Sequence, residues 1–586
     1  MWTVEKSRII HGIGRGDLDF LNIDDSGELC IRLNEEVIAI RDVIERAFQD
    51  DSLEGSSETS LQIQIPQLLS AQIEKLERVF VFQMKESGYS GRYLPLYPLK
   101  ANHRVGFLEN VLESHPVYGL EIGSKAELVL ARRVLEEFQS RTVVCNGAKD
   151  DEYFRLARSL SAQDNRVLIS LESVPEVVHA LDFFGPGDIQ FAFRVKPYMS
   201  SGGHWRHSGG RNAKFGLAVH ELIEAADIFK DSVLRDDLVG VHGHLGSQLV
   251  DLDVGVADYG RYLTRIFFLL KKQGFPNLTT IDVGGGIPVD YRCEFNGDAI
   301  TAFAGSLLDG IQEVCREEGA TDHPTIMTES GRIVGAKATL ILVRALYTKS
   351  VFPDINPTDS TFVSLQREME SIGDAERLET MWEEFKHPPR SAVNLEAIEK
   401  HEQRVFLFKS ILRRRLLQEE LEVTSALREW LFEPDYIVVG NFSVFKSVPD
   451  HVLVGQHFPV IPISGHEKQP QTTVRLADIT CDSDGEISPF VMRQSEEDVL
   501  FTRDWRPLTS VKRFTTRGIP VSDPHDVDYF LIALTGAYQD ALDVGPYLFR
   551  DLPRIELTLG SDGIFTLDWI QKSAQVSGMD DSYFRS

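Results

Sequence analysis

The sequence predicts an α/β protein: a (β/α)8 barrel of TIM type, a helical insertion and a C-terminal β-rich domain. Three observations support this prediction. Apolar strand-like runs alternate with amphipathic helical stretches from about residue 65 to 350. Residues 363–430 then combine many charges with apolar residues at three- and four-residue spacing. From residue 431 to 586 the pattern shortens to β-type runs.

Taken in order, residues 1–64 contain short alternating runs such as LCIRL, and we expect this segment to pack with the β-rich domain. The barrel, residues 65–350, has strand-like runs that end in glycine, polar or charged residues. These runs are YLPLYPL, TVVCNG, RVLISL, IQFAFRV, LVGVHGHLG, TTIDVGGG and PTIMTESG, with helices expected near 104–114, 150–160 and 174–184.

The insertion is expected to form helices packed on the barrel. The last domain, residues 431–586, contains a helix expected around 526–543. Its β-type runs are YIVVGNF, HVLVGQHFPVIPI, TVRLADITCDSDG and IELTLG.

Composition excludes several classes of function. The 586 residues carry a formal charge of −28, and no basic run interleaved with aromatics appears, so nucleic acid is not an expected partner. No run of 18 apolar residues and no leader-like start occur, so we expect no membrane association. The odd number of cysteines, without a CxxC pair, favours a reducing compartment, and we expect the cytoplasm. They are Cys30, Cys145, Cys293, Cys315 and Cys481.

In such a barrel the functional groups directly follow the strands. Lys100 ends the segment GRYLPLYPLKAN, where its amine would lie at the mouth of a dry barrel. Burial lowers the pKa of a lysine, and the neutral amine can then condense with an aldehyde. A solvated lysine at a strand end is the alternative.

The segment TIDVGGGIPVDY places Gly284, Gly285 and Gly286 after a strand, where their backbone N–H groups could approach a phosphate. A tight turn is the alternative. In GVHGHLGSQL, the imidazole of His244 could lie flat on a planar ring while Ser247 reaches the phosphate. His242 and His244 also form an HxH pair, a metal-ligand spacing, so a metallohydrolase is a rival interpretation.

Further charges follow other strands. In TIMTESGRIVG, Glu329 could pair with a protonated pyridine nitrogen and Arg332 with a phosphate, and Gly331 lies between them. Glu121 and Arg194 could meet at the mouth of the barrel. An ordinary ion pair is the alternative for each of these charges.

The segment ADITCDSDG carries the last candidate group. The Cys481 thiol could deliver a proton to a reactive carbon, and Asp482 and Asp484 could hold a cationic side chain. An ordinary turn is the alternative.

With these residues assembled, the chain resembles the biosynthetic arginine decarboxylases, pyridoxal-phosphate enzymes of alanine-racemase-like fold within group 2 of the ornithine, lysine, arginine and diaminopimelate decarboxylases. The matching segments cover most of the chain in the family's order. They are YPLKANH, YGLEIGSKAEL, VCNGAKDDEYFRLA, SSGGHWRHSGGRNAKFGL, HGHLGSQL, IDVGGGIPVDY, TESGR, GNFSVFKSVPD, HFPVIPI, ITCDSDG and GAYQDAL.

The resemblance implies that pyridoxal phosphate is bound covalently to Lys100, with His244 stacked on its ring and Glu329 at the pyridine nitrogen. Its phosphate would be bound by Ser247, Gly284, Gly285, Gly286, Arg332 and Tyr538. The implied reaction converts L-arginine to agmatine and CO2, a step of polyamine biosynthesis. Magnesium is possible by resemblance only.

The resemblance also implies a homodimer or higher homo-oligomer with shared active sites, in which Cys481 and Asp482 serve the cofactor of the other subunit. One departure concerns substrate choice, because the family usually reads NFSLFQSLPD where this chain has NFSVFKSVPD. Lys446 would oppose a guanidinium, whereas Asp450 and Asp482 could hold it. Decarboxylation of ornithine, lysine or diaminopimelate, and an inactive regulatory homologue, therefore stay open.

Overall fold

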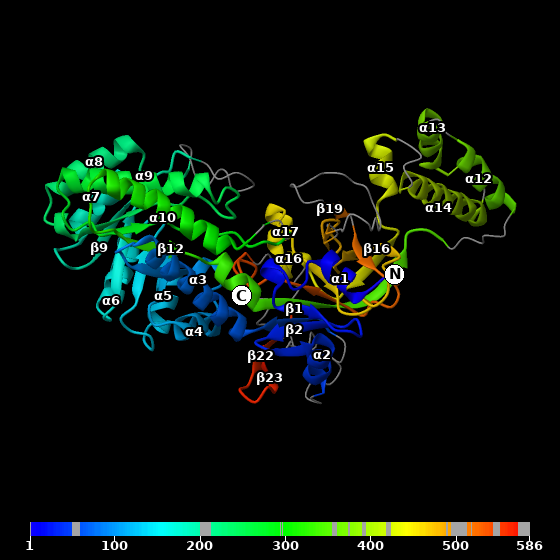
Figure 1. The fold of residues 1–586 in the computed structure, drawn as a ribbon, viewed down its shortest axis with the longest axis horizontal. Helices are drawn as coiled ribbons and strands as arrows, with labels where there is room; N and C mark the ends of the chain where they lie inside the picture. The colour runs from blue at the N-terminus through cyan, green and yellow to red at the C-terminus, as the bar shows by residue number, and fades with distance from the viewer. Residues whose placement is uncertain are drawn as a thin grey trace, which may run out of the picture.

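A computed structural model of the chain describes residues 2–49, 59–199, 213–292, 295, 297–353, 360–372, 375–388, 394–417, 423–487, 490–493, 513–516, 518–542 and 551–571. The molecule is elongated, with the barrel at one end, a β-rich domain in the middle and the inserted helices at the other end (Figure 1). In the ranges just given, no helix is long and apolar enough to cross a membrane.

Eight parallel strands close into a barrel, which confirms the predicted (β/α)8 fold. In sequence order they are β5 (Tyr93–Pro98), β6 (Gly119–Ile122), β7 (Thr142–Cys145), β8 (Arg166–Leu171), β9 (Gln190–Arg194), β10 (Leu238–His242), β11 (Thr280–Asp282) and β12 (Thr325–Glu329). β12 pairs with β5, which closes the circle. Apolar side chains fill one layer inside the barrel: Leu96, Val144, Leu168, Ala192, Val239 and Met327.

Helices surround the strands: α3 (Pro66–Ser87), α4 (Val105–Ser114), α5 (Lys125–Val134), α6 (Asp151–Ser161), α7 (Val174–Phe183), α8 (Val219–Lys230), α9 (Val254–Gln273) and α10 (Ala299–Glu317). Helix α6 illustrates why they form. Asp150 caps it by accepting a hydrogen bond from the backbone N–H of Tyr153. Phe154, Ala157 and Leu160 lie one helical turn apart and are buried together against the barrel.

The β-rich domain is built around β13 (Thr339–Ser350), which leaves the barrel after α11 (Arg332–Gly335) and the short turn Ala336–Ala338. β13 pairs with β4 (Leu61–Gln64), β14 (Tyr436–Gly440) and β21 (Tyr529–Ile532). The remaining strands of this sheet are β15 (Val460–Pro462), β16 (Thr472–Ala477), β17 (Glu486–Ile487), β20 (Ile519–Val521), β22 (Arg554–Leu559) and β23 (Phe565–Gln571). Within the described residues, β18 (Phe490–Arg493) and β19 (Arg513–Thr516) form a separate two-stranded sheet.

The N-terminal segment lies against this sheet. It contains α1 (Val4–His11), Gly16–Leu18, β1 (Leu21–Ile23), β2 (Leu29–Leu33), β3 (Glu36–Ala39) and α2 (Ile40–Phe48). The backbone N–H of Leu29 donates to the carbonyl oxygen of Ile463 at 2.8 Å. Arg41 pairs with Asp528 at 3.0 Å.

Between β13 and β14 stand the inserted helices α12 (Ser360–Ser371), α13 (Ala375–Phe385), α14 (Leu395–Leu417) and α15 (Ser425–Leu431). They bury a small core of their own, which includes Met369, Leu378, Phe408 and Leu412. In Figure 1 these helices lie beyond the β-rich domain, at the end of the molecule opposite the barrel. The expectation that they pack on the barrel is therefore wrong, because their apolar faces pack on one another.

Two predicted elements of the last domain are also wrong. The helix expected around 526–543 is strand β21 followed by turns up to Leu542. The apolar residues from Tyr529 onward suit a helix, but a continuous apolar run also suits a strand that is buried on both faces. All four residues of β21 are buried, and the strand pairs with β13 on one side and β15 on the other. Within HVLVGQHFPVIPI, the first residues belong to helix α17 (Pro449–Val454), which ends at Gly455 with a φ of 64°.

Candidate active site

A cavity of about 620 Å³ opens at the carboxyl ends of the barrel strands. It lies where barrel and β-rich domain meet, because α11, α17 and the turn after β21 supply part of its wall. Six predicted site residues line it: Lys100, His244, Ser247, Arg332, Asp450 and Tyr538. Residues of α5 and of the turn after β21 complete the wall, among them Glu127, Leu130 and Leu542.

Lys100 stands on the single turn Leu99–Ala101 that follows β5. Its Nζ lies 2.9 Å from Oε2 of Glu121, which is buried at the end of β6. Burial alone would lower the pKa of Lys100, but the carboxylates of Glu121 and Glu329 outweigh this effect and raise the pKa. The expected depressed pKa of Lys100 is therefore wrong for this form of the site, because a carboxylate sits beside the amine.

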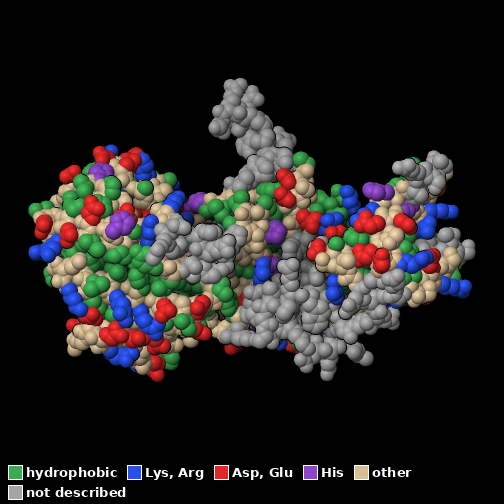
Figure 2. Space-filling view, turned by 90° about the horizontal axis from the view of Figure 1, so that it is seen from above, with side chains coloured by type: hydrophobic (Ala, Val, Ile, Leu, Met, Phe, Trp, Pro, Cys, Tyr) green, Lys and Arg blue, Asp and Glu red, His purple; other side chains and the backbone are tan. Residues whose placement is uncertain are grey.

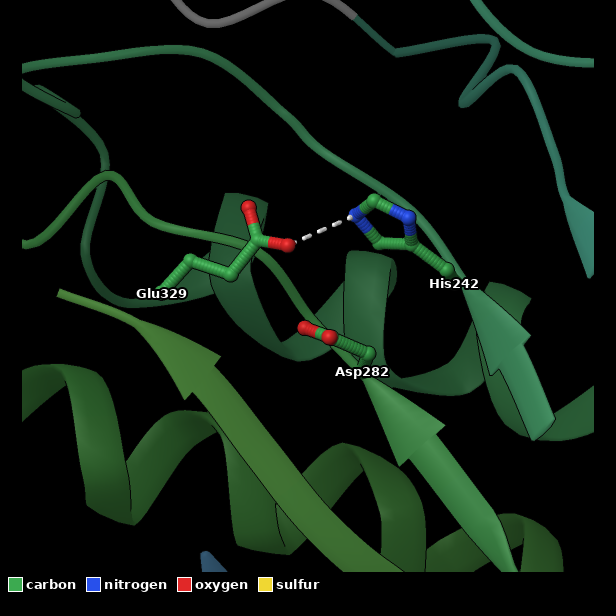
Figure 3. A group of neighbouring side chains, drawn as sticks. All are labelled: His242, Asp282 and Glu329. Atoms are coloured by element: carbon green, nitrogen blue, oxygen red, sulfur yellow. Dashed lines mark ion pairs between the residues drawn. The ribbon is translucent and has the colours of Figure 1, made fainter. Parts of the chain in front are cut away.

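Glu329, at the end of β12, belongs to a buried polar group with His242 and Asp282 (Figure 3). His242 Nε2 lies 3.5 Å from Oε1 of Glu329, and Ser170 Oγ lies 2.7 Å from Nδ1 of the same imidazole. Burial lowers the pKa of His242 well below its ordinary value, so this imidazole is neutral. Burial, followed by the charge of Glu121, raises the pKa of Glu329 well above its usual range.

Asp282 accepts a hydrogen bond from the backbone N–H of Gly284 at 2.9 Å, while its Oδ2 has no partner among the described residues. Burial raises the pKa of Asp282 to about 7. His242, Asp282 and Glu329 each offer one ligand atom within 4.8 Å of the others, so this group could also hold a metal ion. His244 does not join it, so the HxH pair does not supply two ligands to one metal ion here.

The three glycines after β11 pack closely around His244. Gly284 has a φ of 67° and Gly286 a φ of 118°, conformations that favour glycine. A Cβ atom on Gly284 would lie 2.8 Å from Nδ1 of His244, and one on Gly285 would lie 2.6 Å from the carbonyl oxygen of Glu329. Burial and the nearby cations lower the pKa of His244 to about 3, so its ring is neutral.

Arg332 begins helix α11 directly after Gly331, whose missing side chain lets it pack against Pro98 and Ala101. The Arg332 guanidinium stacks on the Tyr538 ring, 4.5 Å from its centroid. Nη1 of Arg332 lies 3.3 Å from Oδ2 of Asp450, so this carboxylate, which we expected to hold substrate, already has a cationic partner. Nε of Arg332 and Oδ1 of Asp450 have no hydrogen-bond partner within the described part of the chain.

Other predicted residues lie elsewhere. Arg194 pairs with Glu172 at 2.9 Å, whereas Glu121 binds Lys100 and Asn146, so the expected meeting of Arg194 with Glu121 is not seen. Lys446 lies 3.0 Å from Asp551, which offsets the charge that would oppose a guanidinium.

Cys481, Asp482 and Asp484 form an exposed turn after β16 and do not line the cavity. The backbone N–H of Asp484 donates to Oδ1 of Asp482 at 3.0 Å. Residues 200–212, which hold most of the segment SSGGHWRHSGGRNAKFGL, lie outside the described residues, as does Cys293.

Asn146 and Tyr291 are site residues that were not predicted from the sequence. Asn146 directly follows β7, so the rule that selected the other strand ends could have found it. Nothing in the run VDY marks Tyr291 as a site residue, yet its hydroxyl lies 3.3 Å from Nη1 of Arg332.

Comparison with known proteins finds similarity both for the barrel and for nearly the whole chain. Residues 72–336, which include all eight barrel strands, match the family model described as the pyridoxal-binding domain of pyridoxal-dependent decarboxylases. Over these residues the chain is similar to the pyridoxal-dependent decarboxylases.

Its relatives align over nearly the whole chain. The biosynthetic arginine decarboxylase of Pseudomonas putida is 29% identical over 96% of this chain and 88% of its own length. That of Aeromonas salmonicida is 28% identical over 96% and 89%. The crystal structure of the biosynthetic arginine decarboxylase from Campylobacter jejuni superimposes with a TM-score of 0.74, at 25% identity, over 97% of this chain and 90% of that one.

The residues of the cavity suit the cofactor of this family. A primary amine and a neutral imidazole line the cavity. The close-packed glycines lie behind His244, and the buried carboxylates lie close to Lys100, so both groups stand directly beside the cavity. Several buried polar atoms there lack a partner among the described residues: His244 Nδ1, Asp282 Oδ2, Arg332 Nε and Asp450 Oδ1. Such atoms are costly to bury unless a bound group satisfies them.

Proposed function

We propose that this decarboxylase converts L-arginine to agmatine and CO2 and so serves polyamine biosynthesis. The observation that carries the proposal is the placement of Lys100 beside Glu121 in a cavity that also contains His244, Ser247 and Arg332. Arginine is the preferred substrate because the relatives aligned over 96% of the chain are named biosynthetic arginine decarboxylases.

Pyridoxal phosphate, when bound, withdraws electrons from the bond that is broken at the α-carbon of the amino acid. Lys100 would hold the cofactor covalently, and its amine would be released when the substrate amine takes its place. The neutral ring of His244 would cover one face of the cofactor. The Glu329 carboxylate would accept a hydrogen bond from the protonated pyridine nitrogen.

The phosphate would lie at the other end of the cavity. Ser247, the backbone N–H groups of Gly285 and Gly286, and the Tyr538 hydroxyl would donate to it. The backbone N–H of Gly284, which was also expected to bind the phosphate, already donates to Asp282. Arg332 would supply positive charge, and Asp450 would hold that guanidinium in place through the 3.3 Å contact. This assignment gives Asp450 a role beside the cofactor. Magnesium rests on the resemblance alone; His242, Asp282 and Glu329 could hold a metal ion, but Glu329 is assigned here to the pyridine nitrogen.

Cys481, the proposed proton donor for the α-carbon, is exposed and does not line the cavity of its own chain. We therefore propose a homodimer in which this turn, with Cys481, Asp482 and Asp484, enters the cavity of a second copy. Cys481 would protonate the α-carbon after loss of CO2, and the two carboxylates would hold the guanidinium of the substrate.

We also propose a reducing, cytoplasmic location. It is supported by the thiols of Cys30, Cys145, Cys315 and Cys481, which are free in the described residues.

The test is the release of CO2 by purified protein with and without added pyridoxal phosphate. L-arginine, L-ornithine, L-lysine and diaminopimelate are offered separately, and the product amine is identified by mass spectrometry. We expect agmatine from arginine, with added cofactor raising the rate. A higher rate with any of the other three amino acids would replace the proposed substrate, and no CO2 from any of them would refute decarboxylation.

A further inference from the structure

Asn146 links two carboxylates that the proposed mechanism uses separately. Its side-chain nitrogen donates to Oε1 of Glu121 at 2.8 Å and to Oε1 of Glu329 at 2.7 Å. All three side chains are buried. Asn146 directly follows β7, whereas Glu121 and Glu329 lie at the carboxyl ends of β6 and β12. Because Glu121 also binds Lys100, one chain of contacts joins the amine to the carboxylate assigned to the pyridine nitrogen.

Two carboxylates in a buried site repel each other, and this repulsion would push Glu329 away or favour its uptake of a proton. The charge of Glu121 acts in this direction on Glu329, second only to burial. A primary amide is suited to this position, because its two N–H bonds can point to two acceptors and it brings no charge. A serine hydroxyl has one hydrogen to donate and could serve only one of them.

The backbone around Asn146 is held on both sides, so the amide is placed rigidly. Its backbone N–H donates to the carbonyl oxygen of Ile122 at 2.7 Å, and the hydroxyl of Tyr153 donates to its carbonyl oxygen at 3.0 Å. Gly147, with a φ of 77°, then turns the chain where a Cβ would lie 2.7 Å from the carbonyl oxygen of Gly123.

We propose that Asn146 is a positioning residue: its amide bridges the two buried carboxylates and holds Glu329 in place for the ring nitrogen of the cofactor. The inference rests on the proposed function, because it requires that pyridoxal phosphate occupies the cavity. Asn146 itself does not contact the reacting atoms; it acts through Glu329.

The test compares two ligands that differ only at the ring nitrogen. Full-length protein freed of cofactor is titrated with pyridoxal phosphate and with the analogue in which a C–H group replaces that nitrogen. Asn146→Ala should weaken the binding of pyridoxal phosphate about tenfold more than that of the analogue, because a hydrogen bond to a charged group is lost only where Glu329 faces a nitrogen. Asn146→Ser, with one donor left, should give an intermediate ratio.

Tyr153→Phe is the matched control, because it removes a hydrogen bond from the same backbone segment but leaves the amide. Any weakening in this variant should be equal for the two ligands, and circular dichroism checks that each variant folds. Equal weakening of both ligands by Asn146→Ala and Asn146→Ser would make the residue merely structural and overturn the inference. If the wild-type protein binds neither ligand, the proposed function itself is wrong, which is a different outcome.

Discussion

At the scale of single residues, the site places several buried carboxylates around the amine of Lys100. Glu121, Asp282 and Glu329 gather near Lys100, and burial raises the pKa of both Asp282 and Glu329. A protonated pyridine nitrogen would bring positive charge to this group and so favour the ionised carboxylates. The binding of the pyridine nitrogen therefore depends on where the Glu329 carboxylate lies as well as on its charge. Gly285, in the neighbouring loop, packs directly against the backbone of Glu329.

Gly285→Ala tests this close packing. The added Cβ would lie 2.6 Å from the carbonyl oxygen of Glu329, a contact with backbone that cannot turn aside. We expect the free energy of unfolding to fall by about 1–3 kcal/mol and cofactor affinity to fall with it. Urea denaturation and titration with pyridoxal phosphate measure the two effects.

Gly106→Ala is the control for that change. Gly106 lies in α4, and a Cβ there would meet nothing within 4 Å. Because Gly106 lies in the first turn of α4, alanine there should not lower the free energy of unfolding and should leave cofactor affinity unchanged. Equal behaviour of the two variants would show that the glycine loop is not tightly packed against Glu329.

The strand-end rule explains which site residues could be predicted. Lys100, His244 and Arg332 each follow a strand in sequence, and a parallel barrel necessarily brings such positions to one face. Their partners could not be predicted in the same way. That Asn146 reaches Glu329 depends on side chains crossing the mouth between β7 and β12, which are not neighbours in the barrel.

At the scale of elements, helix α1 shows how the N-terminal segment is attached. Oγ of Ser7 lies 2.8 Å from Nδ1 of His466, whose Nε2 lies 2.7 Å from the carbonyl oxygen of Pro462. The Trp2 indole donates to the carbonyl oxygen of His466 at 3.0 Å. Burial lowers the pKa of His466 to about 4, so the contact depends on a neutral imidazole.

This attachment predicts sensitivity to acid. The unfolded chain takes up a proton at His466 near pH 6.5, whereas the folded chain does so only near pH 4. The contribution of His466 should therefore be fully present above pH 6.5 and be lost as the pH falls toward 4, by about 1.4 kcal/mol per pH unit. Urea denaturation of the wild type and of His466→Gln at pH 7, 6 and 5 measures it, and the variant should lose less stability on acidification. Parallel pH profiles would contradict the assignment.

Elements also show where sequence patterns fail. The run from Tyr529 to Leu542 has the spacing of a helix, yet pairing on both sides makes its start a strand. The inserted helices could be predicted from their apolar periodicity. The surface against which they pack could not, because the periodicity shows that a helix has an apolar face but not which element covers it. Both failures come from tertiary contacts between segments distant in sequence.

At the scale of the whole molecule, one chain places its candidate proton donor outside its own cavity. Cys481 is exposed in the β-rich domain. Figure 2 shows hydrophobic side chains gathered over the barrel on the face seen from above. Large apolar side chains exposed on the barrel include Ile223, Val250, Val254 and Leu269. A second copy could cover such a surface while bringing its own turn at Cys481 to the cavity.

Mixing two inactive variants tests this shared site. Lys100→Ala should lack the covalent cofactor, and Cys481→Ala should retain it but decarboxylate slowly or protonate wrongly. If subunits exchange at random, half the dimers carry both variants and one intact site, so activity should return to about a quarter of the wild-type level. Activity no higher than the mean of the separate variants would place Lys100 and Cys481 in one subunit's site.

Covalent trapping of the cofactor tests the proposed role of Lys100 without any assumption about the substrate. Purified wild-type protein is incubated with pyridoxal phosphate, reduced with borohydride, digested and analysed by mass spectrometry. We expect a stable phosphopyridoxyl adduct on Lys100 and its loss in Lys100→Ala. An unmodified Lys100 peptide, or an adduct that persists on another lysine in the variant while decarboxylation continues, would contradict that role.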